Sequence, residues 1–207
     1  MKSETKIRKT ASMIPVAYIL WFVTFYVKPS NFWLDISISS LILFSIAIRF
    51  SKPFPMARIP KLRNVVIGIL SAAFLYLVFL AGGSAISFLN LGTIYVGSIY
   101  SLASNTNPFL LTVLLVFPIA SGEESFWRGY IQEKFSRRFG PAVGIAISIL
   151  GDTTVHISSL NPVLVGAAFV TSICWALIFR YTRDLSASLT SHIIWDILVF
   201  VILPVST

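Results

Sequence analysis

The sequence predicts an all-α fold, a polytopic membrane bundle of about seven transmembrane helices, and three observations support this fold class. Of the 207 residues, 56% are hydrophobic and only 12% are charged, whereas a soluble domain is about 25% charged. The apolar residues form long runs, close to the roughly 20 residues that a helix needs to cross a bilayer. The runs also lack the alternation of barrel strands, and lipid-exposed backbone must form helices or closed barrels.

Seven apolar runs define the expected spans. They cover about 11–28, 33–50, 64–88, 108–127 with a polar continuation, 141–158, 162–180 and 186–203. No small-residue cleavage site follows the first run, so we interpret it as an uncleaved span rather than a signal peptide. Residues 90–107 carry no charge and could form an outer loop, an interfacial helix or a re-entrant segment. Because no soluble stretch separates the runs, we expect a single integral-membrane domain over residues 1–207, with a motif-bearing core at 108–203.

The basic residues predict membrane topology rather than nucleic-acid binding. The net charge is +8, but Lys and Arg lie in short segments between the apolar runs. A cytoplasmic N-terminus places all of them except Lys28 on the inner side, and seven spans then put the C-terminus outside. In a prokaryote, this membrane would be the cell membrane. The single cysteine, Cys174, excludes an internal disulfide and a multi-cysteine metal site, and we interpret it as a packed core thiol.

Ionisable residues inside the expected spans are the strongest indication of function. A charge in hydrocarbon costs at least about 2.5–3.5 kcal/mol on insertion scales, so membrane spans rarely carry one without a use. Both histidines of the chain and four of its eight acidic residues fall in the apolar runs, together with one arginine. They are Glu123, Glu124, Arg128, Asp152, His156, His192 and Asp196. Carboxylates and imidazoles together can carry out acid–base chemistry.

Helix geometry assigns different roles to the first two acids. Glu124 and Arg128 are four residues apart, so they share a helix face and are expected to pair as structural support. Glu123 lies about 100° around the helix and lacks that partner, which suits a general base or acid. Counting outward from the turn at Gly140 places Glu123 and His156 at similar heights on an antiparallel hairpin, although counting does not determine their faces.

The last span carries a second pair of acid–base groups. His192 and Asp196 are also four residues apart, and the carboxylate can orient the imidazole ring. His192 is only about ten ångströms from the inner end of its helix, so helix tilt or a deeper helix start must bring it level with His156. Asp152 lies one turn before His156 and could be an additional carboxyl on the same face.

The residues alone leave alternatives open. The charged groups could form a buried polar network that holds the helices together. Two histidines and a carboxylate also suit zinc, but histidines on separate spans are less specific than a compact His-Glu-x-x-His motif, so we expect no metal and no cofactor. Buried carboxyls and histidines can also relay protons in a transporter. The chain, however, has no inverted repeat and no pair of interrupted spans in matching halves.

Three motifs resemble those of the CAAX prenyl protease and bacteriocin-processing family of intramembrane endopeptidases. The resemblance covers roughly 108–203 and rests on the order and spacing of the motifs. They are Glu123-Glu124-x-x-x-Arg128, the later His156, and His192-x-x-x-Asp196. The resemblance implies a seven- or eight-helix fold with a glutamate-type active site that opens to the membrane interior.

The resemblance also implies residue roles and a substrate class. Glu123 and His156 would activate water, and His192 with Asp196 would stabilise the oxyanion. The family usually has phenylalanine four residues before the middle histidine, where this chain has Asp152, and this departure changes the wall around the site.

We therefore expect an intramembrane endopeptidase that acts at the lipid bilayer on a membrane-associated peptide, such as a prenylated C-terminus, a leader peptide or a sorting tail. A catalytically silent self-immunity or scaffold protein of the same family is the main alternative, followed by the proton-coupled transporter. No nucleic-acid partner is expected, and the sequence makes no prediction of the oligomeric state.

Overall fold

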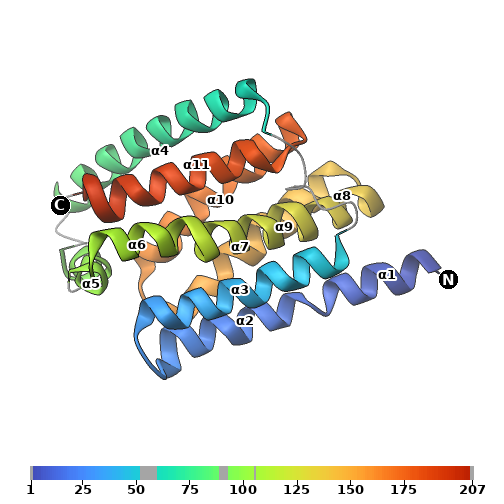
Figure 1. Ribbon diagram of the computed structural model, residues 1–207, viewed down its shortest axis with the longest axis horizontal. Coiled ribbons are helices and arrows are strands. Elements are labelled where there is room, and N and C mark those ends of the chain that lie inside the picture. The colour runs from blue at the N-terminus through green and yellow to red at the C-terminus, as the bar shows by residue number, and fades with distance from the viewer. Residues whose placement is uncertain (1, 52–59, 89–92, 105, 206–207) are drawn as a thin grey trace.

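The computed structural model describes residues 2–51, 60–88, 93–104 and 106–205, and these residues form helices without a strand. Figure 1 shows most of the helices running antiparallel along the long axis of the bundle. Seven of the described helical segments are long and apolar enough to cross a membrane, so the predicted all-α polytopic bundle is confirmed. They are Ile7–Val27, Phe32–Phe50, Leu62–Phe88, Pro108–Phe139, Pro141–Ser159, Pro162–Thr182 and Leu185–Ile202. The chain is a multi-pass integral membrane protein.

The first two spans form a hairpin along one side of the bundle (Figure 1). α1 (Lys2–Ala11) leads into α2 (Ile14–Phe22), which continues as the π-helical segment η1 (Val23–Val27). α3 (Phe32–Phe50) begins at Asn31, whose side chain accepts a hydrogen bond from the Trp33 amide at 2.9 Å and so caps the helix.

The opposite side of the bundle is formed by α4 and α11 (Figure 1). α4 (Leu62–Phe88) packs along α11 (Leu185–Ile197), which ends in the π-helical segment η6 (Leu198–Ile202). α10 (Pro162–Thr182) forms a hairpin with α11 and also packs against α9 of the preceding hairpin.

The fourth span lies between these two sides and is helical well beyond its apolar part. Its polar continuation is therefore part of the same helical segment. The segment consists of α6 (Pro108–Leu114), η3 (Leu115–Ala120), α7 (Ser121–Glu124), η4 (Ser125–Gln132) and α8 (Glu133–Phe139). It is followed by α9 (Pro141–Val155) and the short 3₁₀ segment η5 (His156–Ser159).

A kink and a close helix contact place the acidic pair in the bundle interior. Pro118 lies inside η3 and has no amide hydrogen to donate, and the preceding Phe117 has non-helical angles of φ −149° and ψ 126°. One turn later, a side chain on Gly122 would collide with the backbone carbonyl of Ser40 on α3. The absence of a side chain at Gly122 therefore lets α7 approach α3 closely and fixes where the next residue, Glu123, emerges.

A short helix occupies most of the uncharged segment 90–107, for which the sequence left three structures open. α5 (Thr93–Ala103) is about 16 Å long at 1.5 Å per residue, too short to cross the bilayer. The Asn161 amide donates to the Tyr95 carbonyl at 2.9 Å, and the Trp33 indole donates to the Leu102 carbonyl at 2.7 Å. These bonds attach α5 to the spanning helices. Residues 90–92 and 105 of the segment lie outside the described residues.

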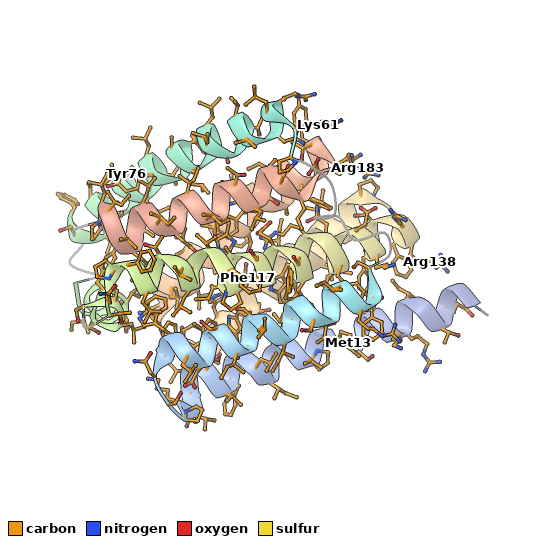
Figure 2. The ribbon with its side chains drawn as sticks, viewed as in Figure 1. Met13, Lys61, Tyr76, Phe117, Arg138 and Arg183 are labelled. Carbon is orange, nitrogen blue, oxygen red and sulfur yellow. The ribbon has the colours of Figure 1, made fainter. Side chains whose placement is uncertain are left out.

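The N and C ends of the chain lie at opposite ends of the bundle (Figure 1). Lys61, Arg138 and Arg183 lie at the same end as α1 in Figure 2. This clustering of basic residues is the arrangement that the positive-inside rule predicts for a cytoplasmic N-terminus.

Cysteine labelling tests this orientation. In a Cys174→Ala background, Ser104→Cys should react with a membrane-impermeant maleimide on intact cells, because Ser104 is exposed at the far end of the bundle. The exposed Lys61, replaced by Cys, should react only after the membrane is permeabilised. The reverse pattern would place the N-terminus outside.

Candidate active site

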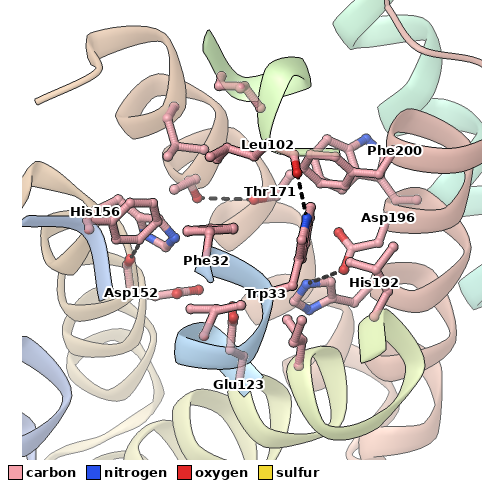
Figure 3. Close-up of a pocket in the computed structure, with 18 of the residues that line it drawn as sticks. Phe32, Trp33, Leu102, Glu123, Asp152, His156, Thr171, His192, Asp196 and Phe200 are labelled. Atoms are coloured by element: carbon pink, nitrogen blue, oxygen red, sulfur yellow. Dashed lines mark hydrogen bonds and ion pairs between the residues drawn. The ribbon is translucent and has the colours of Figure 1, made fainter. Parts of the chain in front are cut away.

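One cavity of about 130 Å³ brings together five of the residues selected from the sequence. They come from α7, α9, η5 and α11 and are Glu123, Asp152, His156, His192 and Asp196. Figure 3 shows His156 on one side of the cavity, His192 and Asp196 on the other, and Glu123 below both. Apart from Thr171, aromatic and aliphatic side chains form the rest of the wall, including Phe25, Phe32, Trp33, Ile119, Leu164, Trp175 and Phe200. Polar groups therefore converge in an otherwise apolar cavity, which is the usual character of a binding or active site.

Glu123 is a buried carboxylate that faces the cavity. Its exposed fraction is 8%, and it has no hydrogen-bond or ion-pair partner among the described residues. Burial of an unpaired carboxylate is costly unless water or a ligand compensates it. The position of Glu123 therefore fits a group that meets a water molecule or a substrate in the cavity.

Arg128 is fully buried and holds two carboxylates. Its Nη1 lies 3.2 Å from Glu124 Oε1, the pair expected from the sequence, and 2.6 Å from Asp152 Oδ2. The Ser172 hydroxyl donates to the same Asp152 oxygen at 2.6 Å, and Arg128 Nη2 donates to the Ser172 carbonyl at 3.3 Å. The Asp152 carboxylate therefore belongs to an ion-pair network that joins the fourth, fifth and sixth spans.

His192 lies between two carboxylates. Its Nδ1 is 3.3 Å from Glu124 Oε1, and its Nε2 is 3.4 Å from Asp196 Oδ2. When both ring nitrogens face carboxylate oxygens, the arrangement suits a doubly protonated ring with two donors. The ring also stacks on Trp175, with centroids 3.7 Å apart and an interplanar angle of 14°. Three contacts thus fix its orientation, and the expected one to Asp196 is among them.

The start of α11 explains how His192 reaches the level of His156. His192 is 8 residues after Asp184, which caps α11, whereas Glu123 is 17 residues before the Gly140 turn. Figure 1 shows that α8 extends beyond the beginning of α11. The α10–α11 turn therefore lies deeper than the α8–α9 turn, so a residue near the start of α11 lies in the bundle interior.

His156 is bonded at both ring nitrogens. The Trp21 indole donates to Nε2 at 3.3 Å, and Nδ1 lies 2.8 Å from the Asp152 carbonyl oxygen, which can only accept. The ring is therefore neutral, with its proton on Nδ1. Trp21 is fully buried on α2, and Phe25 from the following turn packs on the same ring at 5.9 Å between centroids. The first span thus fixes the orientation of His156.

A comparison with protein-family models finds a match to most of the second half of the chain. Residues 103–198 match the model of the type II CAAX prenyl endopeptidase Rce1-like family. The resemblance to the CAAX prenyl proteases is confirmed. The matched range includes every ionisable residue of the cavity and of the Arg128 network. No curated protein and no solved structure was found to match. The family that this segment resembles is one of CAAX prenyl endopeptidases, and the match covers just under half of the chain.

Several residues that contact the ionisable groups of this site carry no charge and could not be recognised in the sequence. Trp21 lies outside the matched range, on the first span. Trp175 stacks on His192 and also lies 5.4 Å from the Arg128 guanidinium. Ser172 binds Asp152. Tryptophan and serine are common in membrane spans, so only their contacts distinguish these three from packing residues.

The candidate site offers no compact set of metal ligands in the described part of the chain. Nowhere in those residues do three or more His, Cys, Asp or Glu side chains lie close enough together to hold a metal ion. His156 and His192 lie on different sides of the cavity in Figure 3. Activity without a metal stays a prediction.

Proposed function

We propose that the protein is an intramembrane endopeptidase that hydrolyses a peptide bond of a membrane-associated substrate with water activated by Glu123. The observation that carries this proposal is the unpaired Glu123 carboxylate in a cavity that also contains His156, His192 and Asp196. The family match supports the reaction class, and the geometry supports the assignment of roles.

In the first step, the Glu123 carboxylate takes a proton from a cavity water as its oxygen attacks the scissile carbonyl carbon. A correctly placed general base contributes about 10²–10⁴-fold to the rate. His156 completes the positioning of this water. Its bond from Trp21 is 3.3 Å, at the long end of the range for N–H donors, so we propose that water replaces the indole when substrate enters.

In the second step, His192 stabilises the negative charge that develops on the carbonyl oxygen. Glu124 and Asp196 keep its ring in one orientation and favour its positive charge. A preorganised donor of this kind contributes typically 10²–10³-fold to the rate of acyl transfer. The carbon–nitrogen bond then breaks, and the proton held by Glu123 passes to the leaving amine.

The cavity is too small for a peptide, and this limits how a substrate binds. At about 130 Å³ it has room for water and the scissile amide but is below the several hundred cubic ångströms of an ordinary ligand pocket. The rest of the substrate must therefore lie outside this cavity, either against lipid or in an adjoining apolar cavity of about 650 Å³ that shares Leu164, Trp195 and Phe200 with it. A peptide that is anchored in the membrane, by an apolar segment or by an attached lipid, satisfies this condition.

Purified protein in lipid vesicles tests the proposal. Fluorogenic membrane peptides with and without a C-terminal prenyl group should be cleaved, and Glu123→Gln should not cleave them. A proton flux across the same vesicles, without cleavage of any peptide, would favour the transporter. An inert wild-type protein in both assays would favour the silent scaffold.

We expect cleavage to survive removal of metal ions. The two histidines in the cavity have hydrogen-bond and ion-pair partners that suit acid–base roles, so treatment with EDTA or phenanthroline should leave the rate unchanged within about twofold. Loss of activity that added zinc restores would assign His156 and His192 to a metal and contradict the glutamate mechanism.

A further inference from the structure

A second cavity, of about 410 Å³, lies at the end of the bundle where the basic residues gather. It is formed between the α8–α9 turn and the end of α10. Five polar or charged residues and one proline line it: Glu133, Ser136, Arg137, Arg180, Arg183 and Pro141. None of these residues lines the catalytic cavity. We refer to it below as the arginine cavity.

The arginine cavity has more positive than negative charge. Its one carboxylate, Glu133, accepts a hydrogen bond from Arg137 Nε at 2.6 Å. The side chains of Arg180 and Arg183 have no ion-pair or hydrogen-bond partner within the described ranges of the chain. The nearby Asp184 caps α11 by accepting from the Ser186 amide at 2.9 Å. Three guanidinium groups thus face one carboxylate, which leaves two positive charges uncompensated.

The backbone at Arg183 gives a second indication that this side chain has a use. Arg183 ends α10 in the left-handed conformation, with φ 55°, a position that glycine or asparagine usually occupies. A basic residue near a helix end can interact with the helix dipole. The helix dipole does not explain why Arg183 lines the arginine cavity together with Arg137, which belongs to a different hairpin.

We propose that the arginine cavity binds the phosphate group of an anionic phospholipid. Guanidinium groups bind phosphate through paired hydrogen bonds, and the Ser136 hydroxyl adds a further donor. The cavity lies where three membrane spans end, which is the level of the lipid headgroups in the leaflet on that side. Basic pockets between transmembrane helices are known to suit anionic headgroups. This location favours a lipid over a soluble phosphate.

A bound headgroup would connect the two hairpins that carry the catalytic cavity. Arg137 belongs to the hairpin of Glu123 and His156, whereas Arg180 and Arg183 precede the helix of His192. The lipid would thus stabilise their relative position. The proposal does not depend on peptide hydrolysis, because lipid binding is measured in the absence of any substrate.

Native mass spectrometry of detergent-purified protein titrated with phosphatidylglycerol and with phosphatidylcholine tests the proposal. The wild type should retain phosphatidylglycerol preferentially. The double variant Arg180→Gln/Arg183→Gln should bind it about thirtyfold more weakly, because each basic residue near an anionic surface contributes roughly fivefold. The control Arg8→Gln/Arg49→Gln removes the same charge from the same end of the bundle but outside the cavity, and it should change binding less than twofold.

Three outcomes would overturn the proposal. Equal binding of the two lipids would show that the cavity does not select an anionic headgroup. An equal loss in the control variant would reduce the effect to general surface charge. Displacement of phosphatidylglycerol by millimolar inorganic phosphate alone would identify a soluble anion as the occupant. All four arginines are exposed, so size-exclusion chromatography is expected to find each variant folded.

Discussion

Replacement of Glu123 by Gln should abolish peptide cleavage while leaving the folded protein nearly unchanged. The substitution removes the only group in the cavity wall that is both a carboxylate and unpaired among the described residues. It keeps the side-chain volume, and no ion pair in the described structure is lost with the charge. We expect the rate of cleavage to fall by about 10²–10⁴-fold, the usual effect of losing a general base. The measurement is product formation from a fluorogenic membrane peptide in lipid vesicles.

Two controls separate this effect from a general loss of charge. Glu4→Gln makes the same change at an exposed position on α1 and should retain full activity. The melting temperature of Glu123→Gln should lie close to that of the wild type. If Glu123→Gln retained more than about a tenth of the activity, its role as general base would be wrong.

The largest effect on stability is expected for Arg128→Ala. This change leaves Glu124 and Asp152 buried without their shared cation. Removal of one partner from a buried ion pair costs about 3–5 kcal/mol, because the remaining charge is uncompensated. We therefore expect a severe loss of folded protein, measured as the free energy of unfolding in detergent. Arg138→Ala, an exposed arginine ten residues later in the same helical segment, should change stability by no more than about 0.5 kcal/mol.

Double-mutant cycles can show which carboxylate depends more on Arg128. Arg128 Nη1 is closer to Asp152, at 2.6 Å, than to Glu124, at 3.2 Å. Both cycles should give coupling energies within the range of about 0.5–3 kcal/mol, and the cycle with Asp152→Asn should give the larger one. Strictly additive effects of the single changes would mean that the residues do not interact in the membrane.

The features that the sequence predicted are those that follow from helix periodicity and hydrophobicity. A run of about 20 apolar residues has few structures available in lipid, so six of the seven spans could be placed within about four residues of their ends. The fourth span extends to Phe139, twelve residues beyond its apolar part. The four-residue spacing of Glu124 and Arg128 also sufficed to predict their contact. Local geometry of this kind does not depend on how the helices pack.

Contacts between helices could not be predicted in this way. The sequence placed Asp152 on the face of His156, and the structure places its carboxylate on Arg128, 24 residues away. The backbone carbonyl of Asp152, rather than its side chain, contacts His156. Counting along one hairpin gives heights but not the rotation of each helix, and rotation decides which side chain meets which.

Contacts that residues far away in the sequence make with the site also could not be predicted from the sequence pattern. Trp21 reaches His156 across 135 residues, and an apolar span gives no sign that one of its tryptophans donates a hydrogen bond. The depth of His192 depends on where the α10–α11 turn lies relative to the α8–α9 turn, which is a property of the packed bundle. The catalytic cavity therefore needs the first span as well as the segment that matches the family.

Hydrolysis in isotopically labelled water tests the central claim most directly. Wild-type protein in lipid vesicles is incubated with a membrane-anchored peptide in H₂¹⁸O, and the products are analysed by mass spectrometry. The new carboxyl group should contain one ¹⁸O atom from solvent, and Glu123→Gln should form no such product. Unlabelled cleavage products, or labelled products formed equally by Glu123→Gln, would contradict the activation of water by Glu123.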